Sequence, residues 1–537
     1  MKKILTLSGI ACLIFITTLG YSQTGKVAKN KNETAKSDLV VKNIIEIGKT
    51  DNQTMTHLDI LCNRFGGRLL GSDAYDNAAD WCASQFLKWG MKVETPEAGT
   101  LPVGFNRGPW FGRMLSDNGM ILHFATPSYT SGTHGIQKGH VVLEPKSQSE
   151  FDRMKLKLKD AWVLITGDNL GWPIDFSRKA DMHRDSLIAD NIDIAKKNAE
   201  IRDAARKNGV TPEQIKYLTP KDEPALFYKQ MKEAGILGII QSAPLPIRVL
   251  YDRKNIDSMT FETLPTVPDI KLDEHQYKVI EQMARERQRF ELEFDIRNYF
   301  KMGPIKYHSV IGIIPGTEHP EQLTIVSGHL DCFDVASGGV DDGSGASPTM
   351  EAARLIMKAG GKPKQTILFC LWAGEEFGLY GSTDWVKKNA DKLTKISNMF
   401  NRDGGPTVAN SLSVSDAMWD DMVKICEPLN SINPDFPFTM TKRTASPRPV
   451  GRGSTDSSPF GKAGVPIMTF GTADTKGYGF DYQEIWHTER DMYNMSIPEY
   501  QNHTSIVTAV VAYGVANLDH LLSREGYYAP DAPVTAK

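Results

Sequence analysis

The sequence predicts a layered α/β fold built on a mostly parallel central sheet. Strand-like and helix-like segments alternate through its C-terminal half, and this alternation is typical of parallel sheets covered by helices. Polar residues follow several of the apolar strands, where such sheets collect functional side chains. The expected strands are 309–314, 323–327 and 366–372, and the expected helices are 347–358, 381–389 and 501–522.

Composition restricts the classes of function. The chain has 537 residues, with 62 Lys and Arg against 65 Asp and Glu, a net charge of −3. This balance offers no broad basic field, so we expect no nucleic-acid partner. The six cysteines include no C-x-x-C pair, which argues against a zinc finger or a disulfide scaffold. Cys62 and Cys82 are the first disulfide pair to test.

The N-terminus predicts export. Met1-Lys2-Lys3 precedes an apolar run over 4–19, and Gly20-Tyr21-Ser22 then places small residues at positions −3 and −1 of a cleavage site. This pattern predicts a secretory signal peptide cleaved near Ser22, and hence a periplasmic or secreted protein. A membrane anchor is the alternative, but a span needs roughly 20 apolar residues. We therefore expect no membrane span.

The middle of the chain differs in character from its flanks. Short strand-like runs surround a highly charged stretch over 178–221, which indicates an inserted module. The predicted division is a signal peptide 1–22, a disordered lead-in 23–37, a discontinuous catalytic domain 38–127 and 276–525, an inserted domain 128–275, and a C-terminal tail 526–537.

The first candidate site residues come directly after the predicted strand 323–327. His329 and Asp331 share one side of the chain if it stays extended, so an imidazole can bind metal while a carboxylate steadies it. Asp341 and Asp342 lie in a glycine-rich turn before the helix 347–358. Taken alone, a His-x-Asp pair is common, and an acidic pair in that turn equally suits a helix cap.

Two adjacent glutamates, Glu375 and Glu376, end the buried strand 366–372. Buried carboxylates are costly unless paired or metal-bound. One of the two can bind a metal while the other takes a proton from water. Asp403 follows another expected strand, and His487 lies between an aromatic residue and several charges, although a turn acid and a surface histidine would explain these two equally well.

Together these segments supply two imidazoles and three or four carboxylates. That mixture suits two zinc ions bridged by a carboxylate and a water, although these ligand types also admit manganese or cobalt. In order, the segments resemble the secreted zinc exopeptidases related to bacterial leucyl aminopeptidases, and most closely the plasma glutamate carboxypeptidase (carboxypeptidase Q) branch. The resemblance runs from about residue 58 to 522 and includes the turn Gly66-Gly67-Arg68-Leu69-Leu70-Gly71-Ser72.

The resemblance implies a three-layer zinc-exopeptidase fold with a smaller, β-rich, protease-associated insertion. It further implies two Zn²⁺ per chain, one held by His329 and Asp403 and the other by Glu376 and His487, with Asp341 bridging them. We also expect from it that the insertion gates access to the site or supports a homodimer.

The resemblance also assigns the remaining roles. Glu375 is the expected general base, and Asp331 the acid that supports the ligands without binding metal. Many relatives have Asn after the bridging acid, where this chain has Asp342. The expected substrate pocket is a glycine-rich stretch that could equally be a solvated loop, and its residues are Arg448, Arg452, Ser454, Thr455 and Asp456.

The predicted activity is hydrolysis of short peptides or dipeptides by a two-zinc-activated water. Aminopeptidase and carboxypeptidase or dipeptidase action both fit, because basic and acidic residues are both available to bind a substrate terminus. A single-zinc cyclase acting on N-terminal glutamine is a second reading, and a catalytically inactive binding protein a third. The ordered motif set and the insertion favour the peptidase.

Overall fold

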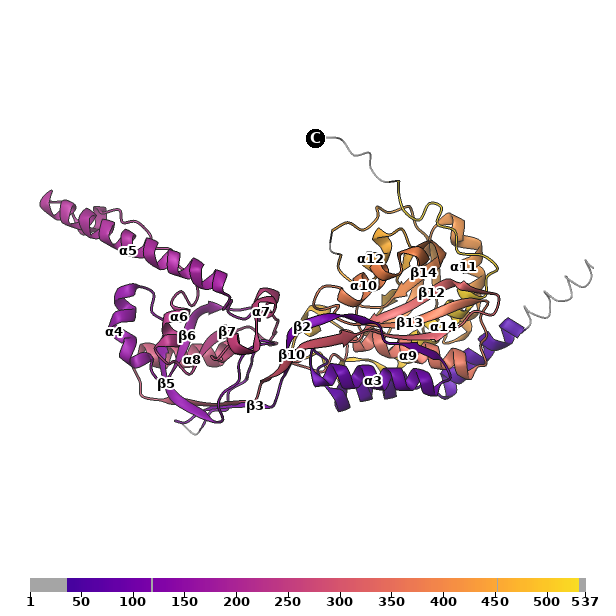
Figure 1. Ribbon diagram of the computed structural model, residues 1–537, viewed down its shortest axis with the longest axis horizontal. Coiled ribbons are helices and arrows are strands. Elements are labelled where there is room, and N and C mark those ends of the chain that lie inside the picture. The colour runs from indigo at the N-terminus through magenta and orange to yellow at the C-terminus, as the bar shows by residue number, and fades with distance from the viewer. Residues whose placement is uncertain (1–35, 117–118, 452, 531–537) are drawn as a thin grey trace, which may run out of the picture.

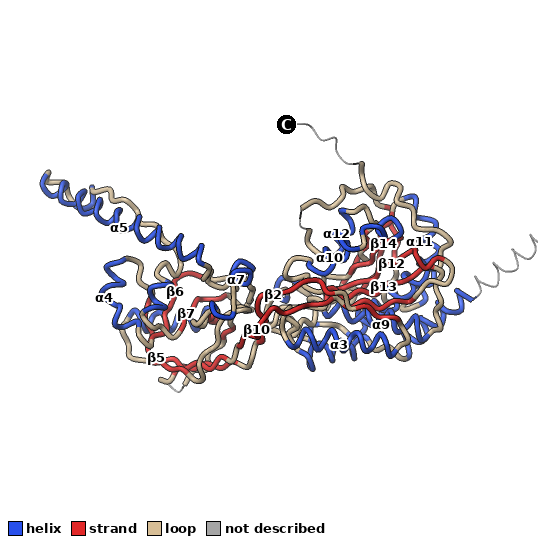
Figure 2. The backbone as a smooth tube through the Cα atoms, in the orientation of Figure 1, coloured by secondary structure: helices blue, strands red, loops and turns tan. Residues whose placement is uncertain are grey.

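The computed structural model describes residues 36–116, 119–451 and 453–530. The predicted signal peptide and most of the lead-in and tail therefore lie outside the described residues. Two lobes are joined by a two-stranded antiparallel ribbon, formed by β2 (Glu97–Asn106) and β10 (Tyr299–His308) (Figures 1 and 2). Both termini of the described chain belong to the larger lobe, on the right of Figure 1.

The larger lobe contains the predicted central sheet. Its strand order is β1-β11-β13-β12-β14-β17. The four strands from β13 to β17 are mutually parallel, whereas β11 pairs antiparallel with β13 and with β1. The bounds are β1 Lys92–Glu94, β11 Val310–Ile314, β12 His319–His329, β13 Gln365–Trp372, β14 Ile396–Asn401 and β17 Ile467–Met468. The mostly parallel α/β sheet is confirmed.

Helices cover both faces of this sheet because successive strand residues point to opposite sides. Val326 and Phe369 pack into one hydrophobic cluster, and their neighbours Ile325 and Leu368 into another. The first cluster is formed or contacted by a helix over 36–50, α2 (Thr54–Asp59), α3 (Asp73–Lys88), α9 (Gly343–Lys358), α11 (Trp419–Cys426) and α14 (Pro498–Ala516). The second cluster includes residues of α10 (Tyr380–Lys388) and α12 (Ser457–Lys462). A short side sheet completes this lobe, with β15 (Val408–Val414), β16 (Thr439–Lys442) and β18 (Gly471–Ala473).

The smaller lobe has a seven-stranded sheet in the order β3-β9-β5-β6-β7-β8-β4, with β5 to β8 parallel. Its strands are β3 Trp110–Met114, β4 Phe124–Ala125, β5 Gln137–Leu143, β6 Ala161–Asp168, β7 Gly238–Ala243, β8 Asp269–Asp273 and β9 Glu291–Ile296. Its helices are α4 Gln148–Leu158, α5 Arg178–Lys207, α6 Tyr228–Glu233, α7 Arg253–Ser258 and α8 Glu274–Arg285.

The smaller lobe differs in two ways from the expected insertion. Strands β3, β4 and β9 complete its sheet and lie outside 128–275. The lobe is also mixed α/β rather than β-rich, because the charged stretch forms the 30-residue helix α5, which has few buried residues. Because this stretch has few apolar residues, its sequence shows no clear helical pattern, and the helix was not predicted.

Cys62 and Cys82 do not form the disulfide that was singled out for testing. All five cysteines in the described part of the chain are free and buried. The Cys62 thiol contacts the Gly338 carbonyl at 3.7 Å, and the Cys82 sulfur lies 3.6 Å from the sulfur of Met350.

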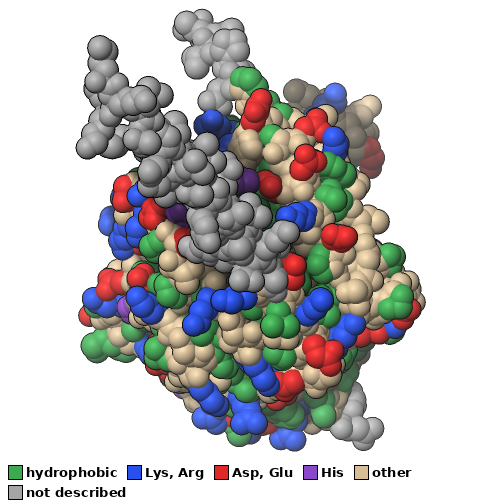
Figure 3. Space-filling model, turned by 90° about the vertical axis from the view of Figure 1, so that its right-hand side faces the viewer, with side chains coloured by type: hydrophobic (Ala, Val, Ile, Leu, Met, Phe, Trp, Pro, Cys, Tyr) green, Lys and Arg blue, Asp and Glu red, His purple; other side chains and the backbone are tan. Residues whose placement is uncertain are grey.

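Charge and hydropathy follow the composition. Where Figure 3 leaves the surface uncovered, basic and acidic side chains are interspersed rather than gathered by sign. Of the helices within the described ranges, none combines the length and apolar character that crossing a bilayer requires.

Candidate active site

The predicted site residues meet at the carboxyl edge of the central sheet. His329 is the last residue of β12, Glu375 and Glu376 follow β13, and Asp403 follows β14. Parallel strands end at the same edge, so these side chains are brought together by topology. Asp341 comes from the loop before α9, and His487 from the turn after α13 (Tyr482–Ile485).

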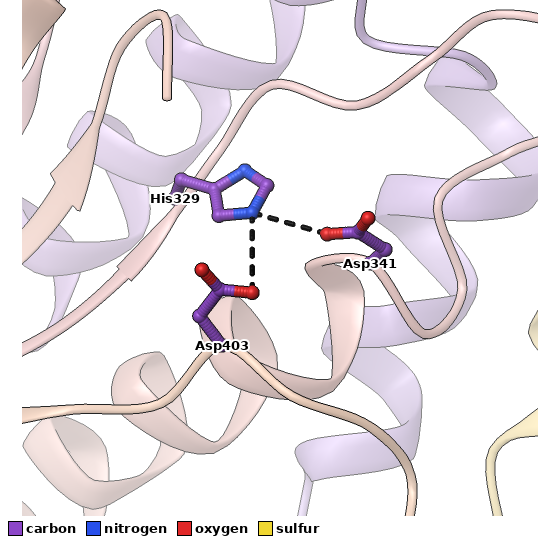
Figure 4. A group of neighbouring side chains, drawn as sticks. All are labelled: His329, Asp341 and Asp403. Atoms are coloured by element: carbon purple, nitrogen blue, oxygen red, sulfur yellow. Dashed lines mark ion pairs between the residues drawn. The ribbon is translucent and has the colours of Figure 1, made fainter. Parts of the chain in front are cut away.

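One group consists of His329, Asp341 and Asp403 (Figure 4). The Nε2 of His329 lies 3.2 Å from the Oδ1 of Asp341 and 3.8 Å from the Oδ1 of Asp403. The two carboxylates approach the same ring nitrogen from different sides. One potential ligand atom from each residue lies within 4.8 Å of the others, a spacing that suits a shared cation.

A second group consists of Asp341, Glu376 and His487. The Nε2 of His487 lies 2.9 Å from the Oε2 of Glu376 and 3.4 Å from the Oδ2 of Asp341. The groups therefore share Asp341, whose two oxygens face different histidines. His487 has a φ of 60°, a conformation that costs a non-glycine residue about 1 kcal/mol or more and is often found at functional sites.

The chemistry of these donors fits bound metal. His329 Nε2 and Glu376 Oε1 are buried and make no hydrogen bond within the described structure. Burial works to lower the pKa of His487, but Glu376 and Asp341 raise it to about 9. Bound cations would offset the charge of these carboxylates, and imidazole nitrogens with carboxylate oxygens are ligands that zinc accepts.

Asp331 organises the groups around it. The Nδ1 of His329 lies 2.8 Å from the Asp331 carbonyl and donates to it, which leaves Nε2 as the ligand atom. The Asp331 carboxylate accepts the backbone N–H groups of Glu375 and Glu376, each at 3.2 Å. Asp331 thus holds the His329 ring through its backbone carbonyl and the loop of Glu375 and Glu376 through its carboxylate.

Asp342 turns away from the metal-ligand groups. Its Oδ2 accepts the backbone N–H of His329 at 2.9 Å, and the side chain is fully buried. Burial, with Asp403 and Asp341 nearby, holds its pKa well above the usual range. Of the adjacent acids it is Asp341 that faces both histidines.

Glu375 lines a cavity of about 420 Å³ over the two groups. Burial, with further contributions from Asp403 and Glu376, raises its pKa well above the usual range. The described residues lining this cavity include no lysine or arginine. Glu375 is therefore a carboxyl group beside the metal-ligand groups that has no basic side chain to pair with in the lining.

The expected pocket residues separate in space. Ser454 and Thr455 line the cavity. Asp456 is buried, accepts a hydrogen bond from the Ser382 hydroxyl, and has its pKa raised by burial to about 8. Arg448 is exposed, lies beside Gly464, and is not part of the cavity lining, while Arg452 lies outside the described residues.

Two buried side chains that sequence reasoning did not assign support the loop before Asp341. Arg68 donates to the carbonyls of Leu330, Ser337 and Gly338 at 2.8, 2.7 and 3.1 Å. Asp491 accepts the N–H of Val340 at 2.6 Å. The glycine-rich turn around Arg68 was visible in the sequence, but its role depends on contacts distant along the chain.

The smaller lobe also reaches the site. The Tyr251 hydroxyl donates to the Glu376 carbonyl at 2.7 Å, and its ring stacks on Phe377 at 4.2 Å. Arg248 lies over Trp486, a wall of the cavity, at 4.9 Å. Tyr482 lines the same cavity. These residues carry no motif, so sequence alone offered no signal for them.

Comparison with known proteins agrees with this geometry. Residues 309–511 match the family described as Peptidase family M28. Carboxypeptidase Q of Mus musculus is 30% identical over 221 residues, covering 40% of this chain and 43% of that protein. Carboxypeptidase Q of Xenopus laevis is 26% identical over 271 residues, covering 49% and 52%. The chain thus spans about half the length of the curated relatives it matches.

A solved structure shows the same fold. The Peptidase M28 precursor from Shewanella amazonensis SB2B aligns with a TM-score of 0.54 at 17% identity, covering 91% of this chain and 99% of that one. The site therefore lies in an α/β fold that this chain shares with that protein.

Proposed function

We propose that this protein is an exported, zinc-dependent exopeptidase that hydrolyses short peptides or dipeptides. The observation that supports this most directly is the pair of ligand groups sharing Asp341, with Glu375 beside them in one cavity. The match of residues 309–511 to Peptidase family M28 and the likeness to proteins named carboxypeptidase Q support the same reaction class.

In this proposal, two Zn²⁺ bind per chain. His329 and Asp403 would hold one ion and Glu376 and His487 the other, and Asp341, which belongs to both ligand groups, would contribute to each. When bound, zinc lowers the pKa of water and polarises the scissile carbonyl. Two ligand groups also favour a peptidase over a single-zinc cyclase.

Glu375 acts as the general base in this scheme. Its carboxylate accepts a proton from the attacking water and returns that proton to the leaving amine. Bound cations would stabilise the ionised carboxylate, which burial alone disfavours. Asp331 positions Glu375 through its backbone N–H and orients His329, without itself contacting substrate.

Whether the enzyme acts as an aminopeptidase or a carboxypeptidase depends on which terminus of the peptide it binds. The relatives named carboxypeptidase Q favour recognition of a free carboxylate. The acidic cavity lining, with no lysine or arginine among its described residues, favours a free amine. Both forms are exopeptidases with the same ligand set.

The test combines metal content with hydrolysis of Leu-, Ala- and Glu-based dipeptides and of their amino-blocked forms. We expect two zinc ions per chain and cleavage of free dipeptides. Cleavage of amino-blocked substrates would assign the carboxypeptidase, and its absence the aminopeptidase or dipeptidase. One zinc or none, with no cleavage, would contradict the proposal.

Glu375→Gln isolates the proposed base. We expect it to keep two zinc ions and to lose about 10²–10⁴-fold in turnover. Glu318→Gln is the matched control, because Glu318 is an exposed glutamate before β12, at the opposite end of that strand from His329. Wild-type turnover in Glu375→Gln would reject the assignment.

The remaining parts of the proposal concern the whole chain. We place a signal peptide over 1–22, to be checked by N-terminal sequencing of the exported protein. We propose that the smaller lobe, which includes the insertion expected over 128–275, gates the site or supports a homodimer. Light scattering would test the homodimer by measuring the molar mass in solution.

A further inference from the structure

A larger cavity, of about 1360 Å³, lies in the smaller lobe. It opens between α4, strand β5 and the C-terminal end of α8. In Figure 1, α4 and β5 lie at the end of the lobe that faces away from the β2–β10 ribbon. Its lining shares no residue with the catalytic cavity, so the proposed peptidase reaction gives no account of it. We refer to it as the basic cleft.

The floor of the basic cleft is apolar and half-buried. Val141 and Leu143 of β5 and Ala284 of α8 pack at the margin of one hydrophobic cluster, and Val142 and Met154 at the margin of another. Strand β5 is hydrogen-bonded to β6 and to β9. Strand β9 pairs only with residues 137–140 of β5, so among the described strands the side of residues 141–143 away from β6 has no partner.

The rim of the basic cleft is strongly positive. Two of its cations already have partners: Lys146 lies 2.8 Å from Glu144, and Arg285 lies 2.6 Å from Glu281. Four more cations have no carboxylate within ion-pair distance among the described residues, and we call them the rim cations. They are exposed and comprise Arg153, Lys157, Arg287 and Arg289.

The acidic residues of the lining do not neutralise the rim cations. Glu144 is buried and accepts hydrogen bonds from Thr166 and from the backbone N–H of Ala225, at 2.7–2.9 Å. Glu150 accepts the N–H of Lys146 at 2.8 Å. Among the described residues of the lining, Glu291 is the only exposed acid. The field at the opening is therefore positive, although the whole chain has a net charge of −3.

We propose that the basic cleft binds an extended acidic peptide segment. The carboxylates of the segment pair with the rim cations, and its apolar side chains contact the floor formed by β5. The cavity exceeds the roughly 300–1,000 Å³ typical of small-molecule sites, so a segment of several residues fits it better than a small anion. The cleft is concave, which suits a peptide better than a flat lipid surface.

The inference can be tested without any peptidase activity. The probe is a fluorescein-labelled, end-blocked peptide of alternating Glu and Leu, titrated with the full chain and followed by anisotropy. Probes of alternating Glu and Ser and of alternating Lys and Leu separate the contributions of floor and charge. Anionic phospholipid vesicles test the lipid alternative.

The decisive variant is Arg153→Glu combined with Lys157→Glu and Arg287→Glu. Its matched control is Lys197→Glu combined with Arg206→Glu and Lys207→Glu, three exposed cations of α5 outside the cleft. We expect the decisive variant to weaken binding by about tenfold or more, because it replaces three attractive charge pairs by three repulsive ones. The control should bind as wild type, and dipeptide hydrolysis should be unchanged in both.

Binding should also weaken as salt rises, since exposed charges are screened. Weaker binding of the Glu-Ser probe would support the apolar floor. The proposal is overturned if the Glu-Leu probe does not bind, if the decisive and control variants bind it equally, or if vesicles bind and the peptide does not.

Discussion

The buried Arg68 allows a test of how the site is held together. Replacing it by Met keeps most of the side-chain volume and removes every N–H donor. The carbonyls of Leu330, Ser337 and Gly338 would then lose hydrogen bonds of 2.8, 2.7 and 3.1 Å in a region closed to solvent. These carbonyls belong to the segment between His329 and Asp341, so the change acts on two proposed ligands at once.

The expected magnitude follows from those three bonds. A buried acceptor left without its donor costs about 1–3 kcal/mol. The carbonyls of Leu330 and Ser337 would be left without a donor, whereas the Gly338 carbonyl keeps the N–H of Gly343 at 3.1 Å, so we expect a loss of about 2–4 kcal/mol in the free energy of unfolding. Removing the buried positive charge returns part of its desolvation cost, which keeps the estimate at the low end of the simple sum.

Urea unfolding followed by tryptophan fluorescence measures the loss, and zinc content measures its effect on the site. Arg64→Met is the control, because Arg64 is exposed in the same segment and should change stability by no more than about 0.5 kcal/mol. Arg68→Lys should lose less than Arg68→Met. A loss below about 1 kcal/mol in Arg68→Met, with full zinc content, would refute this account of the loop.

Three further predictions concern the metal site, the contact between the lobes and a buried histidine of the larger lobe. Removing metal with a chelator should lower the thermal midpoint, because ligands that bind only the folded state stabilise it; an unchanged midpoint in scanning calorimetry would contradict the metal site. Tyr251→Phe deletes the hydroxyl bonded to Glu376 and should cost about 0.5–1.5 kcal/mol by urea unfolding while reducing dipeptide turnover. Unaltered turnover would show that the contact between the lobes does not position Glu376. Burial lowers the pKa of His503 to about 4. Between pH 6.5 and pH 4 the unfolded chain therefore binds a proton that the folded chain excludes. The free energy of unfolding should fall by on the order of 3 kcal/mol over this range. His503→Asn should flatten that decline in urea unfolding at pH 7 and 4.5, and an equally steep decline would show that other groups cause it.

The sequence predicted what depends on local pattern. Apolar strands followed by His329, Glu376 and Asp403 could be identified because a buried strand and the polar residue after it are adjacent in the chain. Which of Asp341 and Asp342 faces the histidines depends on the turn before α9. Asp341, the residue expected from the resemblance, is the one that faces both histidines. That these residues converge required the strand order, which no local pattern contains.

The errors and omissions arise from long-range packing. Cys62 and Cys82 were a reasonable pair by count, but their thiols pack against different groups in the core. Arg448 was placed by its position near other pocket residues, yet it lies beside Gly464, away from the cavity lining. Arg68 lies in the glycine-rich turn 66–72. Its role as a donor to backbone carbonyls follows only from the course of residues 330–338 around its side chain.

The contacts between lobes extend this reasoning to the site as a whole. Phe333 stacks near Tyr251 at 5.8 Å and lies 4.3 Å from the His487 ring, while Tyr251 holds the carbonyl of Glu376. Glu376 and His487 are the two terminal ligands proposed for one ion, and both are therefore packed against groups that contact the smaller lobe. His329 and Asp403 follow strands of the central sheet. A displacement of the smaller lobe should thus disturb the ion held by Glu376 and His487 before the other, so loss of one zinc ahead of the second is the expected order when that contact is weakened.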